Sequence, residues 1–416
     1  MSVEVLTFGC RLNAYESEAI KNRAVEAQLR DCLVVNTCAV TQEAVRQSRQ
    51  AIRKSKRENP ERRIIVTGCA AQIAPQSYAD MPEVDAVFGN AEKLTSGAYA
   101  DFGIGQTEKI RVNDIMSVAE TAPQMVDHFD GKTRAFLQVQ NGCDHRCTFC
   151  VIPYGRGNSR SVAMGAVVSE ARRLVEKGFP EIVLTGVDLT SYGADLPGTP
   201  ALGTMVEKLL NQVPELKRLR LSSLDAIEAD PVLMRMIAQE ERLMPHFHLS
   251  AQSGDDLILK RMKRRHSRAD IIGFCDHVRA VRPEAAFSAD LIAGFPTESE
   301  AMFENTLSLV DDAGLSRLHV FPYSPRAQTP AAKMPQLPRA TVKARAARLR
   351  QKGEAALGVQ LAGMRGSRHT VLAERGGIGR TPCFTPVEIG DEVPHGTFLP
   401  VLITGQRGDH LTGVPA

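Results

Sequence analysis

Short apolar runs alternate with stretches of helical period through the first 90 residues of the chain. The stretches 14–28 and 42–56 carry apolar residues at helical spacing and predict helices. The shorter runs around them predict three strands, over residues 3–8, 33–36 and 63–67. Strands that alternate with helices form parallel βαβ units, so we expect an α/β domain with a parallel sheet. Residues 95–130 show no clear period and predict a connecting segment.

A second series of β–α repeats begins near residue 135. It contains six apolar runs that predict strands, over residues 136–139, 182–185, 218–221, 246–250, 287–292 and 318–322. Helical patterns lie between these runs, for example over 162–177 and 300–313, and a helix-like stretch over 339–357 follows. Six repeats fit an open or partial version of the eight-fold β/α barrel. We therefore predict a partial (β/α)6 barrel.

The end of the chain has a different pattern. Between residues 365 and 416, short apolar runs such as 369–372 and 399–403 are separated by glycines and prolines, and helical period is absent. This pattern predicts a small all-β module. The expected α/β organisation is an N-terminal domain over residues 1–120, the barrel over 130–358 and the β module over 359–416.

Composition limits the class of protein. Of the 416 residues, 43% are apolar and 24% are charged, as in globular proteins. No segment is apolar over the roughly 18 residues that a membrane span needs, and the start of the chain reads as a strand rather than as a signal peptide. We therefore expect a cytoplasmic protein with no membrane partner. In that compartment the nine cysteines are more often thiols or metal ligands than disulfides.

One group of cysteines follows the first predicted barrel strand. Cys143, Cys147 and Cys150 form a C-x3-C-x2-C pattern there, and chemistry in such barrels occurs on loops at the carboxyl ends of strands. Three thiolates on one short loop can bind three irons of a [4Fe–4S] cluster and leave the fourth iron open to a substrate. The alternative is a zinc site with a fourth Cys or His ligand, and His145 lies inside the motif.

A second group comes from the N-terminal domain. Cys10, Cys38 and Cys69 each follow a predicted strand, and parallel strands end at one edge of a sheet, so the three thiols can converge there. Gly9 and Gly68 precede two of them and would let backbone approach a bulky cluster. The alternative is that these cysteines are small buried hydrophobes. Three further cysteines share no such position, and we expect packing roles for the first two: Cys32, Cys275 and Cys383.

The barrel motif, with the aromatic residue Phe149 before its last cysteine, resembles the signature of radical S-adenosylmethionine (SAM) enzymes. The resemblance implies that SAM chelates the open iron and that an electron from the cluster cleaves SAM to a 5′-deoxyadenosyl radical. The three barrel cysteines would then be the catalytic ligands. Phe149 would lie against the cofactor.

Contacts to SAM are expected at the ends of the barrel strands. The candidates are Gly186 after the second strand, Ser223 after the third, Gln252 after the fourth and Asp290 on the fifth. Their placement at strand ends favours cofactor contact. The alternative is turn chemistry, since Gly and Ser are common in turns.

Further motifs extend the resemblance over nearly the whole chain. They are Gly-Cys-Arg-Leu-Asn (9–13), Asn-Thr-Cys-Ala-Val-Thr (36–41), Gly-Cys-Ala-Ala-Gln (68–72), Leu-Ser-Ala-Gln-Ser-Gly (249–254), Ile-Ala-Gly-Phe-Pro-Thr-Glu (292–298) and Tyr-Ser-Pro-Arg-Ala-Gln-Thr-Pro-Ala (323–331). Together with the barrel motif they are similar to the methylthiotransferase family, and the C-terminal module is similar to the TRAM domain, an RNA-binding β barrel.

This family resemblance implies two [4Fe–4S] clusters and the use of SAM both as methyl donor and as radical source. The metal ligands would be Cys10, Cys38 and Cys69 for the cluster that supplies sulfur, and Cys143, Cys147 and Cys150 for the cluster that makes the radical. The implied partners are tRNA and a reducing protein such as flavodoxin or ferredoxin. The sulfur donor is left open.

The motifs at 9–17 and 36–41 resemble the branch that acts on N6-threonylcarbamoyladenosine next to the anticodon, at position 37 of tRNA. Two other branches remain as alternatives, one acting on isopentenyladenosine in tRNA and one on an aspartate of a ribosomal protein. A non-catalytic, metal-binding RNA-binding protein is the alternative from another class. Iron and sulfide content would separate it from a radical SAM enzyme.

Charge is informative in its distribution only, because the net charge is +3. Lysines and arginines cluster over residues 42–57, 260–268 and 313–353, and such runs suit a phosphate backbone. A solvated helix face is the alternative for any one run. Residues 361–416 hold as many acids as arginines, so we expect the TRAM-like module to attract RNA only weakly through its charge.

Overall fold

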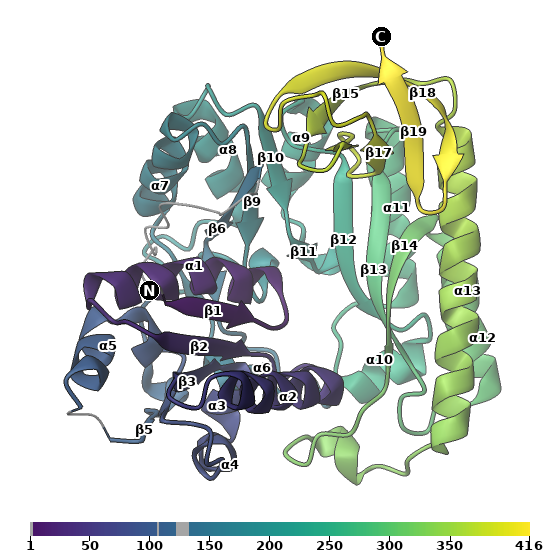
Figure 1. Ribbon diagram of the computed structural model, residues 1–416. Helices are drawn as coiled ribbons and strands as arrows, with labels where there is room; N and C mark the ends of the chain where they lie inside the picture. The colour runs from purple at the N-terminus through teal and green to yellow at the C-terminus, as the bar shows by residue number, and fades with distance from the viewer. Residues whose placement is uncertain (1–2, 106–107, 122–132) are drawn as a thin grey trace.

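The computed structural model describes residues 3–105, 108–121 and 133–416. The N-terminal domain is a five-stranded parallel sheet whose strand order follows the sequence (Figure 1). Its strands are β1 (Glu4–Thr7), β2 (Cys32–Thr37), β3 (Arg63–Gly68), β4 (Ala86–Phe88) and β5 (Ile110–Arg111). The three strands predicted from the apolar runs are confirmed, and the two shorter strands were not predicted.

Helices cover both faces of this sheet because the side chains of its strands alternate. Val34 and Ile65 pack in one buried cluster with α1 (Arg11–Glu26) and α5 (Ser96–Gly103). Leu33 and Ile64 pack in another, on the side of α2 (Gln42–Glu58), α3 (Cys69–Ile73) and α4 (Pro75–Ala79). The prediction of a mere connection over 95–130 is wrong for α5 and β5, which are too short to show a period. Residues 106–107 and 122–130 of that stretch lie outside the described residues.

The barrel has the six parallel strand positions that the repeats predict. One sheet joins β6 (Arg134–Gln138), β9 (Glu181–Thr185) and β10 (Arg218–Leu221), and the other joins β11 (Ser223–Leu224), β12 (His246–Gln252), β13 (Ala286–Ala293) and β14 (Leu315–Pro322). Only Ser222 separates β10 from β11, so the two form one interrupted strand. The predicted α/β fold with a partial (β/α)6 barrel is confirmed.

The helices of this part pack around the outside of the strands (Figure 1). They are α7 (Met164–Glu176), α8 (Leu202–Gln212), α9 (Pro231–Gln239), α10 (Asp256–Met262), α11 (Arg268–Val281), α12 (Glu300–Asp312) and α13 (Arg339–Gly363), with the short helix α6 (Ile152–Arg156) after the cysteine motif. None of the helices in the described part of the chain has the length and apolarity that a membrane span requires.

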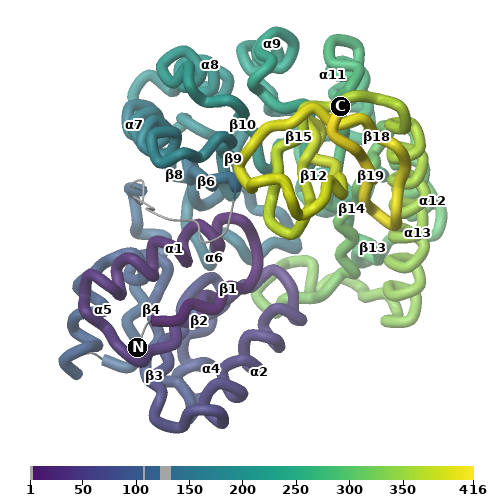
Figure 2. The backbone as a smooth tube through the Cα atoms, turned by 45° about the horizontal axis from the view of Figure 1, so that its top comes forward, coloured from purple at the N-terminus to yellow at the C-terminus, as the bar shows by residue number. Residues whose placement is uncertain are grey.

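Helix α13 leads into the C-terminal module, which is all-β as predicted. Its strands form a closed barrel: β15 (Arg368–Ala373), β16 (Ile378–Arg380), β17 (Pro386–Glu388), β18 (Phe398–Arg407) and β19 (His410–Pro415). Arg218, the first residue of β10, donates to the carbonyl of Thr370, and Arg220 donates to the carbonyl of Pro382 at 2.8 Å. The module therefore covers the amino ends of the barrel strands (Figure 2).

Phe384 of the module lies among arginines at this seam. Its ring centroid is 4.8 Å from the guanidinium carbon of Arg220 and 5.1 Å from that of Arg134. Glu181, whose side chain is fully buried, pairs with the same two arginines at 2.9 and 2.6 Å. Burial alone would raise the pKa of Glu181, but Arg220 and Arg134 outweigh it and lower the pKa to about 2. The seam is thus a packed electrostatic contact.

Candidate active site

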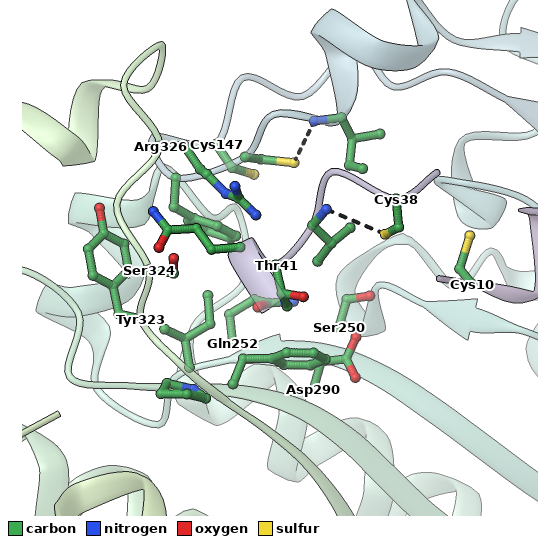
Figure 3. Close-up of a pocket in the computed structure, with 18 of the residues that line it drawn as sticks. Cys10, Cys38, Thr41, Cys147, Ser250, Gln252, Asp290, Tyr323, Ser324 and Arg326 are labelled. Atoms are coloured by element: carbon green, nitrogen blue, oxygen red, sulfur yellow. Dashed lines mark hydrogen bonds between the residues drawn. The ribbon is translucent and has the colours of Figure 1, made fainter. Parts of the chain in front are cut away.

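A cavity of about 1210 Å³ lies between the N-terminal domain and the carboxyl ends of the barrel strands. All six predicted metal-binding cysteines line it, and Figure 3 shows Cys10, Cys38 and Cys147 around it. The structure therefore brings together two groups of cysteines that lie in different domains. The other three cysteines are buried elsewhere, and Cys32 and Cys275 pack in apolar cores as predicted.

The N-terminal cysteines occupy equivalent positions at the edge of the sheet. Cys10 precedes α1, Cys38 follows β2 and Cys69 begins α3. Gly9 has a φ of 101°, and a Cβ on it would lie 2.6 Å from the Cβ of Cys38, so no larger residue fits. Burial raises the pKa of Cys38 to about 12, and the thiols of Cys69 and Cys10 add to the shift. Three thiols at one edge of the sheet that line the same cavity can bind one metal cluster.

The barrel cysteines lie on a loop that is fixed to the neighbouring α10. The backbone N–H of Thr148 donates to the carbonyl of Met262 at 3.0 Å, and the Thr148 hydroxyl donates to the carbonyl of Arg261 at 2.8 Å. Burial raises the pKa of Cys150 to about 12, with Cys147 and also Cys69 of the other domain adding to the shift. The two cysteine groups thus face each other across the cavity.

Arg264 supplies positive charge beside the barrel cysteines. Its Nη1 donates to the Sγ of Cys147 at 3.7 Å, and its Nη2 pairs with Asp225 at 2.6 Å. On the other side, the Sγ of Cys143 lies 3.6 Å from Asp188. A cysteine binds a metal as a thiolate, and a nearby guanidinium stabilises that charge. This donor set fits a thiolate-ligated cluster with one open position.

His145 is engaged with acids rather than with the cysteines. Its Nε2 lies 2.9 Å from Asp188 and 3.5 Å from Glu228. The potential ligand atoms of Cys143, His145 and Asp188 lie within 4.8 Å of one another, so a single metal ion remains geometrically compatible with that corner. The three-cysteine arrangement around an open position favours the iron–sulfur cluster.

A buried charge network joins the two domains beneath the N-terminal cysteines. Arg156 of α6 donates to both carboxylate oxygens of Glu16 on α1, at 2.7 and 2.8 Å, and to Asn13 at 2.5 Å. Lys93 donates to the same carboxylate at 2.7 Å and to Asn90 at 2.6 Å. Burial alone would raise the pKa of Glu16, but Arg156 and Lys93 lower it to about 2. Burial lowers the pKa of Lys93 and the Glu16 carboxylate opposes that shift, so the positive charge under the cysteine group comes chiefly from Arg156.

Every residue predicted to contact SAM lines the same cavity: Phe149, Gly186, Ser223, Gln252 and Asp290. Gln252 holds the left-handed backbone conformation, with a φ of 67°, where the pairing of β12 with β13 is irregular. Such a conformation is sparsely populated for a non-glycine residue and is typical of functional sites. A Cβ on Gly186 would lie 2.9 Å from Oε1 of Gln140, so packing also demands glycine there.

Asp290 has partners of its own. Its carboxylate lies 3.1 Å from Nε2 of His248 and 3.3 Å from Nδ1 of His319. Burial alone would raise the pKa of Asp290, but the hydrogen bonds from the two histidines hold it well below its usual range. Asp290 is therefore an anionic side chain held in a fixed orientation at the cavity wall.

Part of the basic run over 313–353 is paired with acids inside the fold. Arg345 is buried and pairs with Glu298 and Glu300 at 2.9 Å, Arg348 pairs with Glu300, and Lys352 pairs with Asp311 at 2.5 Å. These contacts attach α13 to α12. Arg345 is therefore not accessible to a phosphate, and the charges of Arg348 and Lys352 are partly balanced by acids of α12. The prediction of phosphate contacts stays a prediction.

Three arginines of the cavity were not predicted as site residues. Arg264 lies in a basic run that suggested RNA binding, Arg326 lies in the motif at 323–331, which was given no role for this residue, and Arg156 lies six residues after the last barrel cysteine. Arg326 follows β14 and extends into the cavity (Figure 3). Burial lowers its pKa, and the nearby thiol of Cys38 opposes that shift. The motif Tyr-Ser-Pro-Arg at 323–326 was the available signal.

Comparison with known families and structures agrees with this geometry. Residues 137–310 match the Radical SAM superfamily, and residues 2–89 match a family described as Uncharacterized protein family UPF0004. Among solved structures, the radical S-adenosylmethionine methyltransferase TsrM from Kitasatospora setae, with cobalamin and a [4Fe-4S] cluster bound, superposes with a TM-score of 0.58. That alignment has 12% identity and covers 80% of this chain and 77% of the other, so it shows the fold. Fold and site define a radical SAM protein, a class that uses a [4Fe–4S] cluster and SAM.

Curated relatives narrow the class. The threonylcarbamoyladenosine tRNA methylthiotransferase MtaB of Rickettsia prowazekii is 54% identical over 97% of this chain and 94% of its own. MtaB of Aquifex aeolicus is 39% identical over 81% of this chain and 84% of its own. The tRNA-2-methylthio-N(6)-dimethylallyladenosine synthase of Erythrobacter litoralis is 32% identical over 98% of this chain and 96% of its own. The chain belongs to the methylthiotransferase family, in the branch of the MtaB proteins.

Proposed function

We propose that this protein is a tRNA methylthiotransferase that converts N6-threonylcarbamoyladenosine beside the anticodon to its 2-methylthio derivative by radical SAM chemistry. The observation that carries the proposal is the single cavity lined by both cysteine groups. Sulfur insertion at a carbon needs a hydrogen-abstracting radical and a sulfur source within reach of one substrate atom. A cavity that is walled by two metal-binding groups provides that proximity.

Two [4Fe–4S] clusters are proposed, one on each cysteine group. When bound, the barrel cluster would supply the electron that cleaves SAM, and the N-terminal cluster would supply the sulfur. The chain contributes the surroundings: Arg264 stabilises the thiolate of Cys147, and Arg156 places positive charge beneath the N-terminal group. The strand-end residues Phe149, Gly186, Ser223, Gln252 and Asp290 would hold SAM against the barrel cluster.

The substrate is proposed from the names of the relatives together with the charge at the cavity. Arg339 and Lys343, on the first turns of α13, line the cavity and are exposed. Exposed cations at the entrance of a site suit an RNA backbone. A reducing protein such as flavodoxin or ferredoxin and a cytoplasmic location are part of the same proposal. So is the division into domains over 1–120, 130–358 and 359–416, although α13 continues through residue 358 to Gly363.

Mass spectrometry of tRNA nucleosides tests this function. In a strain that lacks the gene, 2-methylthio-N6-threonylcarbamoyladenosine should disappear while N6-threonylcarbamoyladenosine accumulates, and the cloned gene should restore the product. If the methylthio form of isopentenyladenosine disappeared instead, the protein would be assigned to the branch that acts on isopentenyladenosine in tRNA. The purified protein should hold about eight irons per chain, two four-iron clusters. Zinc in place of iron would support the non-catalytic alternative.

A further inference from the structure

Among the described residues, three cations that line the cavity pair with no acid: Arg326, Arg339 and Lys343. Arg339 and Lys343 are exposed to solvent, whereas Arg326 is partly buried. The other three arginines of the cavity are paired. Arg156 is bound by Glu16, Arg264 by Asp225, and Arg46 by Glu43. Within the described part of the chain, no carboxylate pairs with Arg326, and its Nε and Nη2 atoms are buried without a hydrogen-bond partner. Unsatisfied buried donors of a charged group cost about 1–3 kcal/mol or more, so an anionic ligand that bonds both atoms would gain that free energy.

The two unsatisfied atoms lie on one edge of the guanidinium plane. Nε–H and Nη2–H point in the same direction and form a fork, which matches the two oxygens of a carboxylate or of a phosphate. The fork belongs to a side chain that extends into the cavity (Figure 3). The ligand chemistry that fits is therefore a pair of anionic oxygens on a group that enters the cavity.

The loop that carries Arg326 is fixed between the two domains. Gln42 of α2 donates to the carbonyl of Pro325 at 3.2 Å, and the Thr329 N–H and hydroxyl both bond the carbonyl of Arg326 at 2.8 Å. Shortly after it, the N–H of Ala331 donates to the carbonyl of Thr148, inside the barrel cysteine motif, at 2.9 Å. The guanidinium is thus held on a scaffold that touches both cysteine-bearing domains. A group placed between the two clusters can reach it.

We propose that Arg326 binds the carboxylate of the threonylcarbamoyl group and selects that substituent over neutral ones. This inference rests on the proposed function. A threonylcarbamoyl group carries a free carboxylate on the N6 side of the base, whereas a dimethylallyl group carries no charge. Arg339 and Lys343 line the cavity and are exposed, so they would suit backbone phosphates, and the buried fork of Arg326 would suit the modified base. Arg326 is a specificity-determining residue, and the reaction does not need it as an acid or base.

The test uses the iron–sulfur-loaded enzyme and two anticodon stem-loop RNAs that differ at one group. One carries threonylcarbamoyladenosine, and the other carries its methyl ester, which removes the charge and keeps the shape. We expect the enzyme to bind the acid about 10- to 100-fold more tightly than the ester, and to show the same ratio in kcat/KM. The Arg326→Gln variant should bind both RNAs equally. The Arg326→Lys variant keeps the charge without the fork and should retain only part of the preference.

The control is Arg235→Gln, an exposed arginine of α9 that pairs with Glu207 and does not line the cavity. It should leave the ratio of acid to ester unchanged. If Arg326→Gln weakened both RNAs equally and reduced the salt dependence of binding, the partner would be a backbone phosphate and the inference would be overturned. If the variant raised the KM for SAM at an unchanged ratio, the partner would be the SAM carboxylate, which would also overturn it.

The two proposals fail in different ways. An enzyme that modifies neither RNA would contradict the proposed function, while the binding ratio would still report on Arg326. An enzyme that modifies both RNAs with equal efficiency and affinity would keep the methylthiotransferase function and refute the role of Arg326. Iron content and the melting temperature of Arg326→Gln are measured alongside. If Arg326→Gln loses iron, the comparison uses Arg326→Lys instead. A ratio of acid to ester binding in Arg326→Lys that equals that of the parent enzyme would refute the role proposed for the guanidinium fork.

Discussion

Gly155 of the barrel lies directly against Cys69 of the N-terminal domain. A Cβ on Gly155 would be 3.1 Å from the Cβ of Cys69 and 3.4 Å from its Cα. Asn90 fixes the contact, because its side-chain amide donates to the carbonyl of Gly155 at 2.5 Å and to the Sγ of Cys69 at 3.8 Å. The position of one proposed ligand of the N-terminal cluster is therefore set by a residue of the other domain.

Gly155→Ala should push Cys69 away from its group. Overpacking of this kind costs about 1–3 kcal/mol, and we expect the iron content to fall from about eight towards four per chain. Cleavage of SAM in the absence of RNA should persist, since the barrel cysteines are not displaced. Gly165→Ala on α7 is the matched control, because no atom lies within 4 Å of its Cβ position. Iron analysis and a SAM cleavage assay on both variants check this, and full iron in Gly155→Ala would contradict it.

Single cysteine variants should separate the work of the two clusters. Cys147→Ala should stop reductive cleavage of SAM, because the cluster with the open position loses a ligand. Cys38→Ala should leave that cleavage intact and stop insertion of sulfur into tRNA. The assay follows 5′-deoxyadenosine and the methylthio nucleoside in the same reaction. Loss of SAM cleavage in a Cys38→Ala protein that keeps its barrel cluster would refute the division of labour.

Glu181→Gln should destabilise the seam between the barrel and the C-terminal module. Removing one member of a buried ion pair costs about 3–5 kcal/mol, because Arg134 and Arg220 would then be buried without compensation. Glu207→Gln, which breaks an exposed pair with Arg235, should cost less than about 1 kcal/mol. Urea unfolding at neutral pH measures both values. A loss below about 1 kcal/mol in Glu181→Gln would show that the seam contributes little.

The same carboxylate should make stability depend on acid. The pKa of Glu181 is lowered in the folded chain to about 2 from its ordinary value of 4.5. A lowered folded pKa gives stability that is fully present above the unfolded pKa and is lost as the pH falls through the folded one. The difference in unfolding free energy between the parent and Glu181→Gln should therefore shrink from about pH 5 to pH 2. A difference that stays constant over that range would contradict the assigned ion pair.

Binding of RNA should depend on the cations at the cavity entrance rather than on those paired with α12. Changing Arg339 and Lys343 together to Gln should reduce the slope of log affinity against log salt by about 1.4, since each contact to single-stranded RNA contributes about 0.7. Changing Arg348 and Lys352 together should leave the slope unchanged, because both pair with acids of α12. Anisotropy titrations at several salt concentrations test this, and equal slopes in the two double variants would refute it.

The sequence predicts best the features that can be recognised from a short stretch of the chain. The apolar runs mark strands, and each cysteine of the N-terminal group directly follows one, so the edge at which they meet could be inferred from the parallel topology. The barrel motif is local and needs no knowledge of the fold. For the same reason Gly186 and Gln252 could be placed at the site from their positions at strand ends.

The features that the sequence did not predict depend on pairs that are distant along the chain. Arg156 and Glu16 are 140 residues apart, and Arg345 and Glu300 are 45 apart. A run of arginines shows how much charge is present but not which acids will face it. Arg326 is the converse case, because its proposed role rests on two buried donor atoms that no described residue satisfies. Only the folded arrangement shows that Arg156 and Arg345 are paired with acids, while the proposed ligand-binding arginine, Arg326, has unsatisfied donors.

Synthesis of the chain from its amino end gives the network around Arg156 a further meaning. When the N-terminal domain leaves the ribosome, Cys10, Cys38 and Cys69 are already translated, and Glu16 can pair with Lys93. Arg156 arrives only with the barrel, and with it the contact of Gly155 on Cys69. The nascent domain therefore exposes the proposed metal pocket without the guanidinium of Arg156. We expect iron to be inserted into the N-terminal group after translation of the barrel, so the maturation machinery meets a two-domain client.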